Sequence, residues 1–362
     1  MVSFAGHALP LHYPTGILAE HRHTRNAAGL FDVSHMGQGR LDSPRESSGP
    51  AAFQAVATAF ERLVPGDIAA LQPGQIRYTV LTNQAGGILD DLMVMHGGDH
   101  LFIIVNAATC VADFAHMRTV LSDEIRLTEL TDRALLALQG PQAVGVMERL
   151  VPDTPFRASG ALPFMNAMSL SVAGLACQVS RSGYTGEDGF ELSVATDQAV
   201  TLAERLLAEP EVWPAGLGAR DSLRLEAGLC LHGADIDPAT SPVQAGLAWV
   251  IGRRRWVEAN FPGAEILLAE LTAGPERIRV GLVMQDRVPA RAHAVITDST
   301  GRPIGTVTSG GFSPTLDRPI AMGYVTASHA RPGAPVGVIV RMVQREAEVV
   351  TIPFVPHRYH KG

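Results

Sequence analysis

The sequence predicts an α+β protein with an all-β C-terminal region, and three observations lead to this fold class. The chain has 362 residues, which is enough for two or three domains. Between residues 50 and 131, three consecutive strand signals lie between two helix signals, an order that predicts an antiparallel sheet with helices on one face. Beyond residue 277 the sequence consists of short strand signals separated by glycine and proline, which is typical of a small barrel or sandwich.

The first helix signal lies in residues 50–63, where Phe53, Val56, Phe60 and Leu63 share one helical face. Turn residues then separate three runs rich in β-branched and aromatic side chains, and these runs predict a three-stranded meander. The predicted strands cover residues 74–83, 88–96 and 101–106. A helix over 107–121 and a strand over 124–130 complete this unit.

A second α+β unit follows. We expect strands at 134–139, 164–172, 175–182 and 189–195, a helix opened by Pro141, a helix ending near 208 and another over 215–230. A mixed helix after residue 253 ends at a linker over 273–275. The predicted domains are 1–48 plus 132–252, 49–131 and 277–362.

Composition and charge exclude several classes of function. The net charge is −7 and the isoelectric point is near 6.0, which is unlike a protein that binds nucleic acid through a basic face. No apolar run approaches the roughly 18 residues that a membrane-spanning helix needs. Lys361 is the only lysine, so an internal Schiff-base lysine and a phosphate-binding G-K-[ST] loop are both absent.

The three cysteines, Cys110, Cys177 and Cys230, are far apart in apolar contexts and predict buried free thiols. With no targeting segment visible, we expect a reducing compartment, the bacterial or organellar equivalent of cytosol, and we assign the protein to the bacterial cytoplasm. Two further groups, His21 with His23 and Asp235 with Asp237, lack a third ligand at metal spacing, so we expect no metal.

Two adjacent carboxylates, Asp90 and Asp91, lie within an apolar strand after a glycine turn. Strand side chains alternate, so one of the two must point toward a buried face, where its pKa would be perturbed. The alternative is an aspartate at the strand end that accepts hydrogen bonds from the turn backbone.

The glycine-rich segment 183–191 carries three carboxylates and no cation, which argues against a phosphate site. In the strand that follows, Glu191 and Ser193 share the face opposite Phe190 and Leu192. A carboxylate there suits the paired N–H groups of an aminopyrimidine edge. A solvated strand face is the alternative.

Arg220 and Arg224 are four residues apart on one side of a predicted helix, and such a pair can clamp an anionic tail. The alternative is a surface ion pair between Asp221 and Arg224, which contributes only about 0.2–0.5 kcal/mol.

Taken together, these segments resemble the glycine cleavage system T-protein family over nearly the whole chain. The resemblance rests on the runs FDVSHM (31–36), LVPGDI (63–68), TNQAGGILDDLMV (82–94), ALQGP (137–141), GYTGEDGFE (183–191) and ARDSLRLEAGLCLHGADID (219–237). Three later runs, at 291–293, 304–310 and 321–325, continue it.

The resemblance implies three domains around a central opening, the last of them barrel-like. It also implies transfer of an aminomethyl-derived methylene group from the dihydrolipoyl arm of H-protein to tetrahydrofolate, with release of ammonia. Asp91 matches the aspartate near the folate N10, Glu191 the pterin-binding glutamate, and Arg220 the arginine that recognises the glutamate tail. The family pattern places four further residues around the folate: Met36, Asn106, Trp249 and Tyr359.

Some positions depart from the family pattern: His7 replaces a common tryptophan, and residues 45–50 resemble a small insertion. Both departures affect the surface at which we expect H-protein to dock, and neither affects a folate-binding position. One alternative function is a folate-dependent demethylase of the same superfamily, which the intact GGILDDL and GYTGEDG runs disfavour. Another is a folate-binding protein that assists iron–sulfur assembly, which would require a reactive cysteine.

Overall fold

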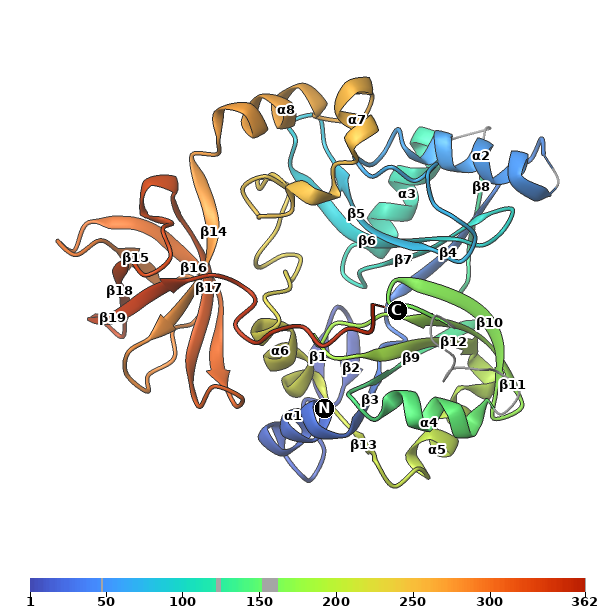
Figure 1. Cartoon of the computed structure of the whole chain (residues 1–362), viewed down its shortest axis with the longest axis horizontal. Coiled ribbons are helices and arrows are strands. Elements are labelled where there is room, and N and C mark those ends of the chain that lie inside the picture. The colour runs from blue at the N-terminus through green and yellow to red at the C-terminus, as the bar shows by residue number, and fades with distance from the viewer. Residues whose placement is uncertain (47, 122–124, 152–161, 362) are drawn as a thin grey trace.

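The computed structural model describes residues 1–361 except 47, 122–124 and 152–161. Three lobes make up the molecule: two α+β lobes, each built on one sheet, and a closed β-barrel (Figure 1). This confirms the predicted fold class. The first residue of the strand predicted over 124–130, and the last residue of the predicted third domain, lie outside the described residues.

The first lobe contains a six-stranded sheet with strand order β10-β11-β12-β9-β3-β13. Its strands are β3 (Ala28–Asp32), β9 (Arg133–Gln139), β10 (Asn166–Val172), β11 (Leu175–Arg181), β12 (Gly189–Ala195) and β13 (Val212–Pro214). Two helices cover one face of this sheet: α4 (Ala143–Leu150) and α5 (Ala199–Leu207), which follows a 3-10 turn at Thr196–Gln198. Their apolar side chains, such as Met147 and Leu202, are buried against Phe190, Leu192 and Val194 of β12. Because strand faces alternate, this leaves Glu191 and Ser193 on the opposite face, as predicted.

Helices α1 (Ile17–Asn26) and α6 (Leu217–Glu226) pack against each other beside this sheet. Helix α6 is shorter than the predicted 215–230. Its end is set by Gly228, which has φ +68° and lets the amide of Leu229 donate to the carbonyl of Arg224. A left-handed glycine just beyond the last helical turn is a common way to close a helix.

The second lobe contains a five-stranded sheet with strand order β5-β6-β7-β4-β8. Its strands are β4 (Gly37–Asp42), β5 (Ile76–Thr82), β6 (Ile88–His96), β7 (Leu101–Val105) and β8 (Arg126–Glu129), and its helices are α2 (Gly49–Phe60) and α3 (Cys110–Leu121). The predicted meander β5-β6-β7 is confirmed. Strand β4, however, pairs with β7 and β8, so the chain passes into this sheet before residue 48, the predicted end of the first segment.

The third lobe is a closed barrel with strand order β14-β17-β16-β15-β18-β19. Its strands are β14 (Arg277–Met284), β15 (Val295–Thr297), β16 (Pro303–Ser313), β17 (Arg318–Thr326), β18 (Pro335–Val340) and β19 (Val343–Val350), with a 3-10 turn at Ala327–His329. A 3-10 turn at Ala248–Val250 and helices α7 (Arg253–Glu258) and α8 (Ala264–Ala273) connect the first lobe to the barrel along the second lobe.

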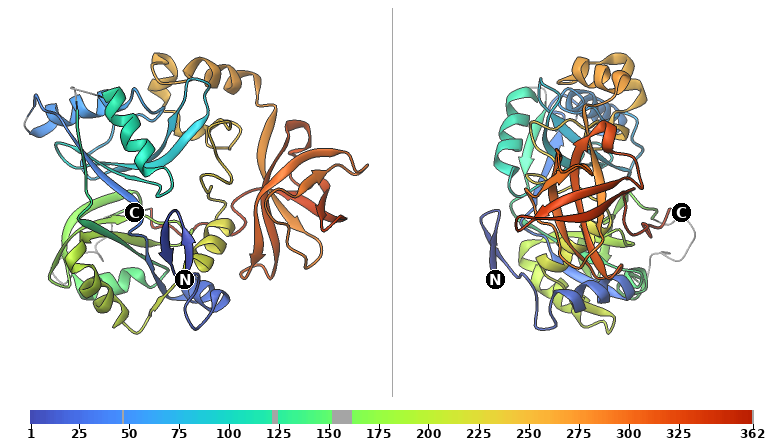
Figure 2. Two further views of the ribbon diagram at one scale, coloured as in Figure 1. Left: turned by 180° about the vertical axis from the view of Figure 1, so that it is seen from behind. Right: turned by 90° about the vertical axis from the view of Figure 1, so that its left-hand side faces the viewer.

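The two termini lie on opposite faces of the molecule (Figure 2, right). At the N-terminus, β1 (Val2–Phe4) and β2 (His7–Leu9) form a hairpin. At the C-terminus, residues 351–361 leave the barrel and run to the α+β lobes; we call this segment the C-terminal strap. The amide of Phe354 donates to the carbonyl of Glu226, and the amide of Phe164 donates to the carbonyl of His360, so the strap is hydrogen-bonded along its path.

Candidate active site

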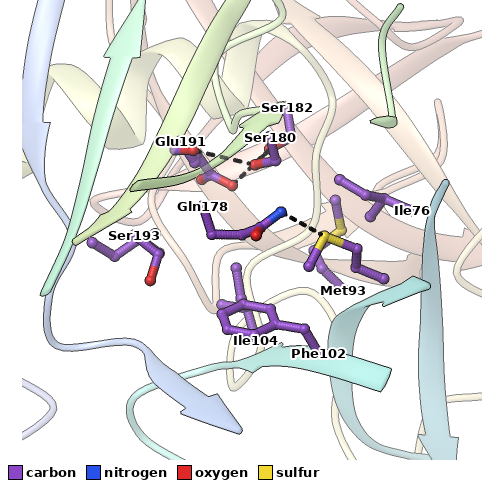
Figure 3. A pocket seen from close by; sticks show the side chains of 11 residues that line it. Ile76, Met93, Phe102, Ile104, Gln178, Ser180, Ser182, Glu191 and Ser193 are labelled. Atoms are coloured by element: carbon purple, nitrogen blue, oxygen red, sulfur yellow. Dashed lines mark hydrogen bonds between the residues drawn. The ribbon is translucent and has the colours of Figure 1, made fainter. Parts of the chain in front are cut away.

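A cavity lies between the two sheets, on the faces that the helices leave uncovered (Figure 3). One wall comes from the second lobe and is apolar; the other comes from β9, β11 and β12 of the first lobe and is largely polar. The lining residues are Ile76, Met93, Met95, Phe102, Ile104, Leu135, Gln178, Ser180, Ser182, Glu191 and Ser193. One wall therefore offers apolar surface, and the other offers hydrogen-bonding groups.

Asp91 lies on the cavity side of the second sheet. In β6 it alternates with Asp90, which is fully buried on the same face as the core residues Leu92 and Val94. Met93 and Met95, two and four residues after Asp91, line the cavity. The predicted opposite facing of the two aspartates is therefore observed, and Asp90 is a core residue rather than a turn-capping one.

Asn106, directly after β7, joins the two carboxylates. Its side-chain amide donates to Oδ1 of Asp90 and to Oδ1 of Asp91, each at 2.8 Å, and its backbone amide donates to Oδ2 of Asp90 at 3.1 Å. The orientation of Asp91 is thus fixed by a residue from the neighbouring strand end. The structure brings these two predicted site residues into direct contact.

The environment of Asp91 raises the pKa of its carboxyl group to about 7. Burial is the largest cause, and the negative charge of Asp90 adds to it, while hydrogen bonds with Tyr78 and Asn106 oppose it. Behind the sheet, burial and the charge of Asp90 raise the pKa of Asp113 on α3 to about 9, so Asp113 is neutral at pH 7 and hydrogen-bonds Asp90. A carboxyl group with a pKa near the working pH is suited to accept and return a proton.

Trp249 is connected to Asp91 through Tyr78, which contacts both residues. The two rings stack with centroids 5.5 Å apart, and 65% of the tryptophan surface is exposed. Since Tyr78 also contacts Asp91, an aromatic surface lies next to the carboxylate. Sequence reasoning missed Tyr78. Val80 pairs with Asp91 across the two strands, and Tyr78 lies two residues before Val80, so Tyr78 shares the sheet face of Asp91.

Glu191 on β12 faces the cavity from the other wall and is half-buried. Its Oε2 accepts a hydrogen bond of 2.8 Å from the Ser182 hydroxyl, which lies 2.7 Å from the hydroxyl of Ser180 (Figure 3). The other carboxylates of the glycine-rich segment are held elsewhere: Glu187 pairs with Arg25 and Arg358, and Asp188 pairs with Arg181.

Arg220 and Arg224 have different environments, and the predicted two-arginine clamp does not form. Arg224 is buried in ion pairs with Asp221 and Asp235, at 2.7 Å each, so the alternative pair is present and is extended by Asp235. Arg220 instead lies over the ring of Tyr184, 5.0 Å from its centroid. Its buried Nη1 has no hydrogen-bond partner among the described residues, which leaves Arg220 alone to receive an anion.

Met36 and Tyr359 lie at the margins of the site. Met36 packs against the first-lobe core around Phe31, as does Ile104, a cavity residue. Tyr359 belongs to the C-terminal strap and stacks on Phe164, with centroids 4.0 Å apart. No described contact joins Tyr359 to Asp91 or Glu191, so the structure brings it near the site only through the strap.

Comparison with known proteins agrees with this architecture. Residues 1–255 match the family model described as the GCVT N-terminal domain, and residues 277–356 match the glycine cleavage T-protein C-terminal barrel domain. The chain belongs to the glycine cleavage T-protein family. Both family domains are present, and the residues between the two matches, 256–276, contain the whole of α8.

Relatives match the chain over nearly its whole length. The mitochondrial aminomethyltransferase of Gallus gallus is 46% identical, and the match covers 99% of this chain and 90% of that one. The human mitochondrial enzyme is 45% identical, with 99% and 87% covered. The crystal structure of aminomethyltransferase T from Bartonella henselae superposes with a TM-score of 0.90 at 42% identity, covering 99% and 95%. The protein is accordingly an aminomethyltransferase of the glycine cleavage system.

Other sequence-based expectations concern groups outside the site. The three cysteines are free; Cys177 and Cys230 are buried and Cys110 is half-buried. His21 bonds Ser222 and Glu226, and His23 stacks on Trp213. In the part of the chain that the structure describes, no helix has the length and apolar character to cross a membrane, and no cluster of three metal-binding side chains occurs.

Proposed function

We propose that the protein transfers a methylene group from the aminomethylated dihydrolipoyl arm of H-protein to tetrahydrofolate, forming 5,10-methylenetetrahydrofolate and ammonia. One observation carries this proposal: Asp91 and Glu191, on the facing surfaces of two sheets, form no ion pair among the described residues. Buried or half-buried carboxylates without a cation need another partner, and the nitrogens of a reduced pterin supply one.

In this proposal Glu191 accepts the paired N–H groups of the pterin edge, with Ser182 orienting its carboxylate. Asp91 lies near the folate nitrogens, and Asn106 holds it in place. Arg220 takes the anionic tail. Glu191 and Arg220 both contact the short Ser182–Tyr184 segment, so neighbouring residues of the first lobe support both groups. Met36, Trp249 and Tyr359 supply apolar and aromatic contacts around it.

The reaction forms bonds from the transferred carbon to N5 and N10 of the folate. It breaks the bond from that carbon to the amino nitrogen and the bond to the lipoyl sulfur. The two protons lost from the folate nitrogens end on ammonia and on the thiol. Ionised Asp91 can accept one of these protons and return it, which is the role that its raised pKa suits. The walls of the cavity position the folate and exclude water.

We propose the cytoplasm of a bacterium as the location. The similarity to the Bartonella henselae protein supports this, whereas the chicken and human relatives are named as mitochondrial.

The proposal is tested by measuring ammonia and methylenetetrahydrofolate formed by the purified protein from tetrahydrofolate and aminomethylated H-protein. Asp91→Asn, which keeps shape and loses charge, should fold normally and lose at least about 100-fold in turnover. Thr119→Ala, at an exposed position on α3, is the control. Folate binding without product from the wild-type protein would contradict the proposal and favour the demethylase alternative.

A further inference from the structure

Two buried polar atoms that have no hydrogen-bond partner among the described residues belong to side chains that interact electrostatically and whose chain neighbours, Met36 and Ala219, pack in one cluster. One is Nη1 of Arg220, already described. The other is Nδ1 of His35, which is buried and has no hydrogen-bond partner among the described residues. Burying such an atom without a partner costs about 1–3 kcal/mol, so a buried ring nitrogen of this kind is expected to meet a ligand or a water molecule.

His35 is held in place by its neighbours. It lies in the turn between β3 and β4, where the amide of Met36 donates to the carbonyl of Val33. Phe4 meets its ring edge-on with centroids 5.5 Å apart, and the ring of His7 lies 6.2 Å away. Both rings belong to the N-terminal hairpin, so the hairpin covers His35 and leaves its Nδ1 directed away from bulk water.

The electrostatic surroundings make His35 a neutral hydrogen-bonding group. Four groups face it: the guanidinium of Arg220, the carboxylate of Asp32, the imidazole of His7 and the Phe4 ring. Burial and the charge of Arg220 are the main causes that lower the pKa of His35 to about 4. A neutral imidazole beside a guanidinium offers one N–H donor next to several others without adding a second charge.

We propose that Nδ1 of His35 and the guanidinium of Arg220 together bind one carboxylate group of the glutamate that ends the folate tail. The inference rests on the proposed function and adds a residue to it. Arg220 provides the charge, and His35 provides a second, directional hydrogen bond. Such charge-assisted pairs are stronger than either bond alone because both donors converge on one anion.

The experiment compares two amide substitutions of His35. In Asn the side-chain nitrogen takes the position of Nδ1, whereas in Gln it takes the position of Nε2. We expect His35→Asn to keep tetrahydrofolate binding within about 2-fold of the wild type and His35→Gln to weaken it about 10-fold. The fold of each variant is checked by thermal unfolding, with His12→Gln, an exposed position before α1, as the control.

Truncation of the ligand identifies the contacted group. Tetrahydropteroate, which lacks the glutamate, should bind wild type and His35→Gln equally. An equal loss for tetrahydrofolate and tetrahydropteroate would overturn the inference, since His35 would then contact the pterin or the benzoyl group. Unchanged tetrahydrofolate binding by His35→Gln would also overturn it. Failure of the wild-type protein to make methylenetetrahydrofolate would instead contradict the proposed function, which this binding assay does not measure.

Discussion

At the scale of single residues, the two adjacent carboxyl groups of β6, Asp90 and Asp91, have different surroundings because they lie on opposite faces of the sheet. Asp91 lies on the cavity side of the sheet, while Asp90 is enclosed by the core, and both receive hydrogen bonds from Asn106. Because Asp90 is negative and close, it makes the ionisation of Asp91 harder. The residue that faces the core therefore adds to the proton affinity of the residue on the cavity side of the sheet.

This arrangement predicts the pH dependence of turnover. With the pKa of Asp91 at about 7, the rate carried by its ionised form should rise about 10-fold per pH unit below 7 and level off above it. Asp90→Asn removes the negative neighbour, lowers the pKa of Asp91 and should move the acidic limb to lower pH. Single-turnover ammonia release between pH 5.5 and 8.5 measures both profiles. An acidic limb that moves to higher pH would contradict this account.

A second prediction concerns the stability conferred by Asp113. Its folded-state pKa of about 9 lies above its unfolded value near 4, so the unfolded chain loses the proton first and stability falls as pH rises between these values. Each pKa unit corresponds to about 1.4 kcal/mol. We expect wild-type unfolding free energy to drop by at least about 1 kcal/mol more than that of Asp113→Asn between pH 5 and 8, measured in urea. Parallel pH profiles for the two proteins would refute the prediction.

The sequence predicted Asp91, Glu191 and Arg220 through motifs, but not the residues that give them their properties. Strand alternation is a local rule, so the separation of Asp90 from Asp91 followed from the sequence. The partners of Glu187, by contrast, come from α1 and from the C-terminal strap, more than 150 residues away along the chain. No local pattern indicates which of several carboxylates a distant arginine will neutralise and which will remain free for a ligand.

At the scale of elements, helix α6 presents two arginines to two environments. Arg224 faces the barrel, where it bonds Ser309 as well as Asp235, while Arg220 lies one turn earlier over Tyr184. Identical side chains spaced four apart share a helix face, so the sequence alone suggested a joint role. The neighbouring barrel, which no helical pattern can show, separates them.

The two positions predict opposite outcomes. Arg224→Ala leaves Asp235 buried without its cation and should cost about 3–5 kcal/mol of unfolding free energy. Arg220→Ala should change stability by less than about 1 kcal/mol, because no described carboxylate forms an ion pair with its guanidinium, yet should weaken folate binding at least 10-fold. Guanidinium chloride unfolding and tetrahydrofolate titration distinguish the two. A folate affinity unaffected by Arg220→Ala would remove Arg220 from the site.

Element boundaries that the sequence predicted well are those fixed by local chemistry. The meander β5-β6-β7 follows glycine turns, and each strand is found within about two residues of its predicted limits. Strand β4 was not predicted as part of the second sheet, since its pairing with β7 and β8 joins segments about 60 to 90 residues apart. Sheet membership depends on such long-range pairing rather than on propensity.

At the scale of the whole molecule, a buried ionic network joins the first lobe to the barrel. Glu226 at the end of α6 accepts hydrogen bonds from Arg25 and His21 of α1 and from Ser313 and Thr315 of the barrel. Burial alone would raise the pKa of Glu226, but the hydrogen bonds from His21 and Ser313 and the charge of Arg25 lower it to about 2. Three separate parts of the chain therefore depend on one carboxylate.

The sign of this shift predicts how stability responds to acid. A carboxyl group with a lowered folded-state pKa stabilises the protein above its unfolded value near 4.3 and loses that contribution as pH falls toward 2. Glu226→Gln should cost about 3–5 kcal/mol at pH 7, and the gap to wild type should close between pH 4.5 and 2.5. Urea unfolding at several pH values measures it. A gap that stays constant on acidification would show that Glu226 is not the titrating group.

The C-terminal strap has a practical consequence for spectroscopy. Its hydrogen bond from Phe164 to His360 anchors the chain one residue before Lys361, whose ammonium is exposed. Since this is the only lysine, an amine-reactive fluorophore applied after the N-terminal amine is blocked labels one place. The dye would sit on the face opposite the N-terminal hairpin (Figure 2, right). Its anisotropy would then report detachment of the strap in real time, without a cysteine having to be engineered.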